Sequence, residues 1–247
     1  MRFRSIAAFV AAGALAVGVP ATTGTAVAST GSGGSSLPTV ISWAMSTGQA
    51  AYRQPLAAEY LVMMSLFGNP IPIPPDDTHK VVLQRRAAGA TRWRAVTTAA
   101  KTVMVTAKDG TQKPHYLLVD FAATGNASYR LVYRSPDASI ASSVSTVRSL
   151  RVSRLMGDRG VNRSGRLLIV GNVNPGWANR AVAFQRRSCA TCRWRSYRTV
   201  RTGARGQYQV RVYAPRSGSW QYRGSVPATT DFTRSWTHTF TVKAPAS

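Results

Sequence analysis

Two stretches of the chain, VVLQRRAAGATRWRAV (Val81–Val96) and VAFQRRSCATCRWRSY (Val182–Tyr197), align without a gap and decide the fold. Both place QRR six residues before WR. A second pair of stretches, YRLVYRSP (Tyr129–Pro136) and WQYRGSVP (Trp220–Pro227), also aligns. The distance along the chain between its two members is ten residues shorter than that between the first two stretches. Because an internal repeat means that one structural unit occurs twice, the sequence predicts two related units, and the first carries about ten additional residues around positions 101–113.

Each copy has the residue pattern of β-strands. QYQVRV (Gln207–Val212) alternates polar and apolar residues, and WTHTFTV (Trp236–Val242) places its threonines on one face and its ring and aliphatic side chains on the other. Turn-forming Gly, Pro, Asn and Asp recur at short intervals between such segments. The sequence therefore predicts an all-β protein of two tandem β-sandwich domains, at 37–152 and 153–247.

The order of segments in each copy is an apolar strand, QRR, a short loop, WR and an aromatic-rich strand that ends in proline. This order resembles the immunoglobulin-like β-sandwich repeats of secreted actinobacterial proteins. The resemblance covers nearly the whole chain after residue 36, and it implies Greek-key sandwiches in an extracellular setting without supplying an active site. The additional residues and the proline-rich stretch at 69–77 depart from the second copy, so they leave the strand number of the first unit open.

The amino end has the three parts of an export signal. Met1–Arg4 is positively charged, and Ala26–Ala28 has the small residues of a cleavage site. Between them, the apolar run Ile6–Val19 is shorter than the roughly 20 residues needed to span a bilayer. The sequence therefore predicts a signal peptide at 1–28, a Gly/Ser-rich linker at 29–36 and a secreted protein without a membrane span.

The two cysteines lie in the turn of the second copy. Cys189 aligns with Ala88 and Cys192 with Thr91, so the first copy builds a turn of the same length without sulfur. A redox CxxC pair needs a helix amino terminus to stabilise the thiolate, and a zinc site needs about four ligands. Export exposes the pair to oxidising conditions. The sequence thus favours a disulfide that staples the turn over redox or metal roles, and it predicts no cofactor.

Basic and aromatic residues crowd the same region. The chain has 32 Lys and Arg against 8 Asp and Glu, which gives a formal net charge of +24. Arginine binds phosphate and carboxylate bidentately and stacks on aromatic rings, so one interpretation is a polyanion-binding surface. The other is that long arginine stems cover a sheet face while their charged ends stay in water. The candidate residues are Arg186, Arg187, Arg193, Trp194, Arg195, Tyr197 and Arg198.

Few residues are suited to catalysis, and the sequence predicts neither an active site nor a metal site. The densest ionisable cluster, Asp76–His79, is expected in a turn between strands. His115 is expected at the surface with Asp120 as its nearest carboxylate. His238 aligns with Arg148, which predicts a partly exposed position in a sheet.

The tryptophans divide into repeated and unrepeated positions. Trp93 and Trp194 are equivalent, and equivalent aromatic residues of repeats usually fill a core or cover a sheet. Trp177, in the turn NPGWANR, has no counterpart in the first copy. Among the tryptophans without a counterpart, Trp177 is the better candidate for an exposed contact.

Two hypotheses of function follow. The first is a secreted, non-catalytic protein with a role in adhesion, cell-envelope association or protein binding. The second is an exported, arginine-rich binder of anionic polymers such as nucleic acid, teichoic acid or acidic polysaccharide, because a large positive charge attracts polyanions. The dependence of affinity on salt separates the two hypotheses.

Overall fold

The structure is a computed structural model that describes residues 36–67, 69–74, 80–107 and 109–245. It is all-β, with 62% of the described residues in strands and no helix among them. No helix that could cross a bilayer occurs in these ranges. The predicted signal peptide, the linker up to residue 35 and Asp76–His79 lie outside the described residues.

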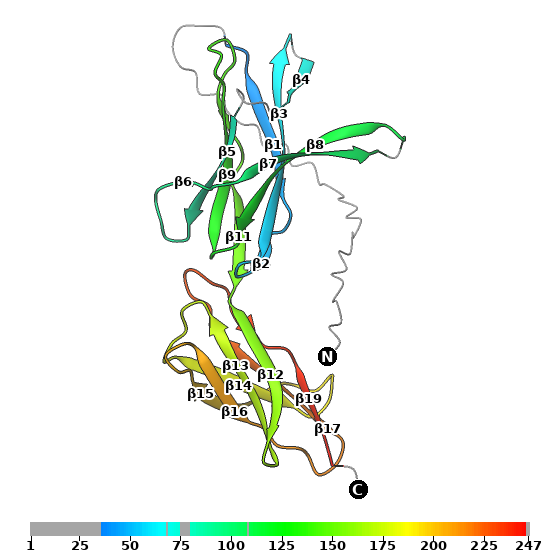
Figure 1. The fold of residues 1–247 in the computed structure, drawn as a ribbon, viewed down its shortest axis with the longest axis vertical. Helices are drawn as coiled ribbons and strands as arrows, with labels where there is room; N and C mark the ends of the chain where they lie inside the picture. Colours follow the sequence, from blue (N-terminus) through cyan, green and yellow to red (C-terminus); the bar gives the residue numbers. More distant parts are fainter. Residues whose placement is uncertain (1–35, 68, 75–79, 108, 246–247) are drawn as a thin grey trace, which may run out of the picture.

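Figure 1 shows the strands gathered into two bodies that follow one another along the long axis of the molecule. The first body contains β1 to β11, and the second body contains β12 to β19. Neighbouring strands are antiparallel, except that β2 runs parallel to β11. The predicted all-β architecture with antiparallel sheets is therefore confirmed.

The first body contains two sheets. One has the spatial order β1 (Thr39–Met45), β3 (Pro55–Leu66), β8 (Gln112–Ala122) and β7 (Ala99–Thr106), with β4 (Asn69–Ile73) also on β3. The other has the order β2 (Gln49–Ala51), β11 (Arg148–Ser153), β9 (Ala127–Arg134), β5 (Lys80–Ala87) and β6 (Arg94–Ala95), with β10 (Ser143–Val144) also on β9.

The second body also contains two sheets. One has the order β12 (Leu155–Arg163), β13 (Arg166–Asn174) and β16 (Gln207–Arg211). The other has the order β15 (Arg195–Arg201), β14 (Ala181–Arg187), β17 (Ser219–Val226) and β18 (Ser235–Trp236), with β19 (Phe240–Lys243) also on β17. Within residues 109–245 the second body has no counterpart of β7, so the additional residues of the first copy form an edge strand and its hairpin.

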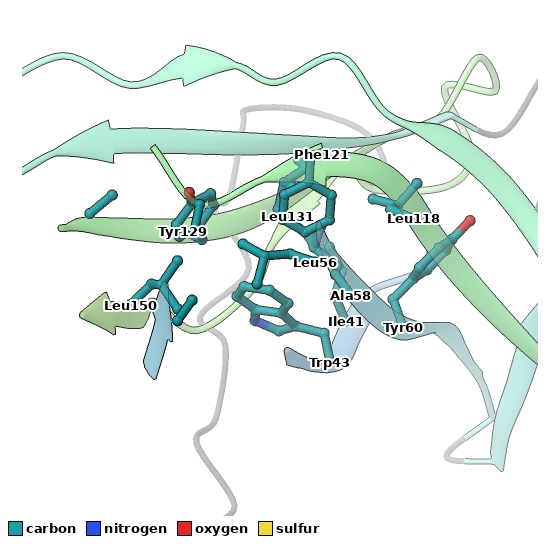
Figure 2. Packing of buried hydrophobic residues seen from close by; sticks show 14 of the residues in the cluster. Ile41, Trp43, Leu56, Ala58, Tyr60, Leu118, Phe121, Tyr129, Leu131 and Leu150 are labelled. Carbon is teal, nitrogen blue, oxygen red and sulfur yellow. The ribbon is translucent and has the colours of Figure 1, made fainter. Parts of the chain in front are cut away.

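Alternation along the strands builds a core in each body. In β9, Tyr129, Leu131 and Tyr133 are buried while the residues between them are partly exposed. Figure 2 shows Tyr129 and Leu131 converging with Trp43 and Leu56 from the facing sheet. Full burial of such a side chain contributes about 1.5–3 kcal/mol. The second body has its own cluster, which includes Ile169, Val182, Phe184, Val210 and Tyr222.

Strand register corrects one detail of the repeat. In the first body Gln84 of β5 lies opposite Arg130 of β9, and in the second Gln185 of β14 lies opposite Arg223 of β17. Arg130 and Arg223 are therefore equivalent, although an alignment anchored on the prolines sets them two positions apart. The first copy carries eight additional residues between the two segments rather than ten. Aligning the two prolines gave the wrong equivalent residues, because a proline ends a strand without determining which residues pair.

The two bodies are fastened by the segment between β17 and β18. Phe232 of this segment is buried in the core of the first body, edge-on to Tyr52 at 6.1 Å between ring centroids. The backbone N–H of Thr233 donates to the carbonyl of Val152 at 2.8 Å, and that of Asn126 donates to the carbonyl of Asp231 at 2.7 Å. The second body thus supplies part of the hydrophobic core of the first.

Arg154 connects β11 to β12 at this junction and is almost fully buried. Its guanidinium carbon lies 4.6 Å from the ring centroid of Trp177 and 4.3 Å from that of Phe232. Its Nε donates to the carbonyl of Pro175 at 3.2 Å, and one Nη donates to the hydroxyl of Thr229 at 3.2 Å. Burial and the nearby Arg180 lower the pKa of Arg154. The stacked guanidinium of Arg154 therefore packs between the hydrophobic cores of the two bodies.

Candidate functional site

The predicted disulfide between Cys189 and Cys192 is confirmed. It closes the turn between β14 and β15 with a Cα–Cα distance of 5.0 Å, and the N–H of Cys192 donates to the carbonyl of Cys189 at 3.3 Å. The chain has two cysteines, so no thiol remains for redox chemistry or metal binding.

The predicted arginine strip is divided between two faces of its sheet. In β14, Val182 and Phe184 are buried in the core, so Arg186 continues on the core side while Gln185 and Arg187 point to the outer face. The guanidinium of Arg186 covers Trp220 at 3.8 Å from the ring centroid. The seven candidate residues therefore do not form one surface.

Trp194 on the outer face lies against two guanidinium groups. The guanidinium carbons of Arg187 and Arg223 are 4.5 Å and 4.2 Å from its ring centroid. Arg223 also lies 4.1 Å from the ring of Trp236, and Arg234 covers the same ring at 5.8 Å. We call the row Arg187, Trp194, Arg223, Trp236 and Arg234 the second ladder.

Two glutamines orient this row. The Nε of Arg187 donates to Gln221 at 2.7 Å, and the Nε of Arg223 donates to Gln185 at 3.0 Å. Both glutamines lie across the β14–β17 pair from the arginine that they hold. Each guanidinium is therefore fixed by a ring and an amide oxygen, and its remaining N–H groups stay available as donors.

The same arrangement occurs in the first body in a shorter form. Trp93 lies 4.9 Å from the guanidinium of Arg86 and 4.4 Å from that of Arg130, and the Nε of Arg130 donates to Gln84 at 2.9 Å. We call the row Arg86, Trp93 and Arg130 the first ladder. It stops at Arg130, because Val144 occupies the strand position that Trp236 has in the second body.

The charges of the second ladder are not neutralised by neighbours. Among the described residues no carboxylate lies within ion-pair distance of Arg187, Arg223 or Arg234. Partial burial lowers the pKa of Arg223, and the positive charge of Arg187 lowers it further. The row therefore concentrates positive charges on one surface. A bound anion would reduce the repulsion between them.

The remaining members of the predicted strip behave differently. Arg193, Arg195 and Arg198 are exposed. The ring of Tyr197 packs edge-on against Tyr222 at 5.1 Å, and its hydroxyl donates to the carbonyl of Arg211 at 2.8 Å. Tyr197 is thus part of the packing at the sheet edge and does not offer a free ring.

Sequence reasoning missed Arg223, Trp236 and Arg234, which complete the second ladder. A signal for Arg223 exists in the repeat, since Tyr129-Arg130 and Tyr222-Arg223 are the same dipeptide at equivalent strand positions. The alignment anchored on proline hid this match. For Trp236, the pairing of β17 with β18 places it beside Arg223, and no local pattern in the sequence reports that contact.

Trp177, the better candidate for an exposed contact, is buried. Its side chain is 5% exposed and its Nε1 donates to the carbonyl of Ala181 at 3.0 Å. Arg154 and Arg180 lie at 4.6 Å and 5.1 Å from its ring centroid. The turn that carries Trp177 folds back over the core of the second body, which an isolated turn sequence does not show.

Two histidines lie within ion-pair distance of carboxylates. His115 of β8 pairs with Glu59 of β3, a cross-strand neighbour that replaces the expected Asp120. The side chain of His238 is 84% exposed, and its Nδ1 lies 2.8 Å from the buried carboxylate of Asp158. The backbone N–H of His238 donates to the same carboxylate at 3.0 Å.

This carboxylate determines the protonation of His238. The hydrogen bond to Asp158 raises the pKa of His238, and the charge of Asp158 raises it further. Within the described residues the side chain of His238 bonds only to Asp158, so no hydroxyl nucleophile is in place beside it. The pair fastens the segment after β18 to β12. No group of three His, Cys, Asp or Glu that could hold a metal occurs in the described ranges.

A shallow groove of about 780 Å³ lies over β12, β13 and β16 on the other sheet of the second body. Polar and cationic side chains line it, among them Arg159, Arg163, Asn172, Arg201 and Gln209. The hydroxyl of Tyr208 is buried beside it without a hydrogen-bond partner among the described residues. Tyr208 lines the groove and also packs on Phe184 in the core, at 5.8 Å between ring centroids.

No protein family matches the chain, and no curated protein matches it.

Proposed function

We propose that the chain is an exported, non-catalytic binding protein of two immunoglobulin-like domains that acts in adhesion, cell-envelope association or protein binding outside the cell. In this proposal residues 1–28 are a cleaved signal peptide and 29–36 a linker, and the domains are 37–152 and 153–247. The repeats resemble those of secreted actinobacterial proteins.

Strand order supports the immunoglobulin-like part of the proposal. In the first body, β1-β3-β8-β7 faces β2-β11-β9-β5-β6, which corresponds to an A-B-E-D sheet against an A′-G-F-C-C′ sheet. In the second body, β12-β13-β16 corresponds to A-B-E, and β15-β14-β17-β19 corresponds to C′-C-F-G. The parallel pairing of β2 with β11 suits an A′ strand beside G.

The second ladder carries the proposed binding role. Arginine and tryptophan are among the residues that dominate binding energy at protein interfaces. Here they are held in fixed positions by stacking and by Gln185 and Gln221, so little conformational entropy remains to be lost on binding. The described histidine pairs fasten strands together.

Binding of the mature chain 29–247 to purified cell-envelope material tests the proposal. We expect saturable binding that the double variant Arg223→Gln/Trp236→Val weakens, while the exposed pair Arg195→Gln/Arg198→Gln leaves it nearly unchanged. Sequencing of the secreted protein should find Ser29 at its amino end. Retention inside the cell, or equal binding by both variants, would overturn the proposal.

Binding of anionic polymers is the second candidate function. The observation that favours it is the unneutralised row of arginines, in which the charge of Arg187 lowers the pKa of Arg223. A chain with 32 Lys and Arg against 8 Asp and Glu attracts polyanions at many points, so a selected site has to exceed that general attraction.

A further inference from the structure

The second ladder combines three arginines with two tryptophans, and guanidinium groups lie against both rings, although Trp236 is 39% exposed. Trp194 is covered by Arg187 and Arg223, and Trp236 by Arg223 and Arg234. A base or a sugar ring that stacked on either tryptophan would have to displace a guanidinium group. The surface therefore offers charged donors more readily than aromatic faces.

Those donors suit phosphate. A guanidinium binds two oxygens of one phosphate through parallel N–H groups, and such charge-assisted bonds are about twice as strong as neutral ones. In Arg187 and Arg223 the Nε is used by a glutamine, which leaves the terminal N–H groups of each fork. Stacking and the glutamines hold both forks in place before a ligand arrives.

The arginines form a row, so a ligand with repeated charges fits better than a single ion. The row follows the sheet from β14 through β17 to the start of β18. A flexible chain can place successive phosphates on Arg187, Arg223 and Arg234. In doing so it relieves the repulsion between Arg187 and Arg223 that lowers the pKa of Arg223.

We propose that the second ladder is a binding site for a flexible phosphodiester polymer without bases, a polyol-phosphate chain. This proposal rests on the proposed binding function and names the ligand of the same surface. Nucleic acid is disfavoured because single-stranded recognition gains about 1–3 kcal/mol per base from stacking on free ring faces, and guanidinium groups already lie against both tryptophans. Acidic polysaccharide offers carboxylates, which arginine also binds bidentately, so its affinity is measured beside that of the phosphate polymer.

The first ladder is the natural comparison within the chain. It has the guanidinium–indole–guanidinium unit of Arg86, Trp93 and Arg130 but ends where Val144 replaces a second tryptophan. It therefore offers two arginines in a row where the second ladder offers three. A chain of phosphates should bind more tightly to the longer row.

The test measures the affinity of the mature protein for poly(glycerol phosphate), for oligo(dT) with the same number of phosphates and for hyaluronate. The ladder variant is Arg187→Gln/Arg223→Gln/Arg234→Gln. The matched control is Arg193→Gln/Arg195→Gln/Arg198→Gln, which removes the same charge from exposed positions in the same sheet region. Thermal unfolding establishes that both variants are folded.

We expect poly(glycerol phosphate) to bind most tightly of the three. We also expect the ladder variant to lose about tenfold or more in affinity for it, and the control about threefold or less, because general charge attraction falls equally in both. Trp236→Val, which keeps every charge and imitates Val144, should reduce affinity by an intermediate factor. This variant keeps the proposal testable if the ladder variant is unstable.

Several outcomes would overturn the inference. Equal losses in the two triple variants would mean diffuse charge, tighter binding of oligo(dT) would indicate a nucleic-acid surface, and tighter binding of hyaluronate would indicate a carboxylate site. If envelope material still binds while poly(glycerol phosphate) does not, the proposed function stands and this ligand is wrong. If neither binds, both proposals fail.

Discussion

The two copies of the QRR turn join equivalent strand pairs by different means. In the first copy Gly89 adopts a left-handed conformation with φ of 77°, which glycine does without steric cost. In the second copy Ala190 takes this position outside the left-handed region, and a disulfide between its neighbours closes the turn. The flanking Arg-Trp-Arg stacking is the same in both. The flanking strands and the stacked side chains therefore determine the turn. The disulfide is added to a turn that forms without it in the first copy.

The two bodies also differ in how much each depends on the other. The segment between β17 and β18 inserts Phe232 into the core of the first body. The second cluster consists of residues from 156 onward, and within the described residues the first body sends no side chain into it. The first body thus has a core that is complete only when the second is folded.

The largest expected effect comes from Phe232→Ala. It removes a side chain that is 6% exposed and leaves a cavity beside Tyr52, so we expect the free energy of unfolding of the first body to fall by about 3 kcal/mol. We also expect urea unfolding, followed by fluorescence, to separate into two transitions. Phe67, which is 94% exposed, provides the control, and Phe67→Ala should change stability by less than about 0.5 kcal/mol. Equal costs for the two variants would contradict the dependence of the first core on the second body.

The disulfide should contribute less. Cys189→Ala/Cys192→Thr imitates the first copy, and closing a loop of this length stabilises by about 2 kcal/mol at most in the chain-entropy treatment. We expect the double variant to be folded and secreted with a modest fall in Tm. Adding Ala190→Gly should recover part of the loss, because it supplies the glycine of the first turn. Loss of all cooperative unfolding would mean that the sulfurs organise more than a turn.

Two equivalent tyrosines give a smaller contrast. The Tyr222 hydroxyl donates to the carbonyl of Tyr213 at 2.8 Å, whereas the buried Tyr129 hydroxyl lies near Arg85 without a hydrogen bond of ordinary geometry to any described residue. Tyr222→Phe should therefore lower the free energy of unfolding by about 1 kcal/mol, and Tyr129→Phe should cost less. Denaturant unfolding of the two variants measures the difference. A larger cost for Tyr129→Phe would show that its hydroxyl is paired in solution.

The sequence predicted the all-β architecture and the disulfide because both depend on local pattern and on the comparison of two copies. The sequence did not predict the correct neighbours of Trp194. Its contact with Arg223 depends on which residues of β14 and β17 lie opposite each other. Proximity in sequence suggested Arg193 and Arg195 as partners, but alternation along the chain carries them away from Trp194. Long-range register was the missing information in each case.

The same limit applies to His238. Its exposed position was predicted by aligning it with Arg148, yet the structure makes Thr146 its counterpart. The hydroxyls of Thr237 and Ser145 each accept a hydrogen bond from a backbone N–H of the neighbouring strand. Each hydroxyl also donates to the carbonyl of the residue that follows it, which is His238 in one copy and Thr146 in the other. Its pairing with Asp158 could not be predicted, because β12 lies 80 residues away in the chain.

The smallest expected effect is a pH dependence that His238→Thr should remove, since this change imitates the first copy. Asp158 raises the pKa of His238 in the folded protein, so protonated His238 stabilises the fold. This contribution is fully present below the unfolded pKa of about 6.5 and disappears as pH rises through the higher folded pKa. The variant should therefore be less stable than the parent at about pH 5 and differ less from it at about pH 8. Thermal unfolding at both pH values measures this, and a gap that widens at high pH would show that the neutral ring, rather than its charge, holds β12.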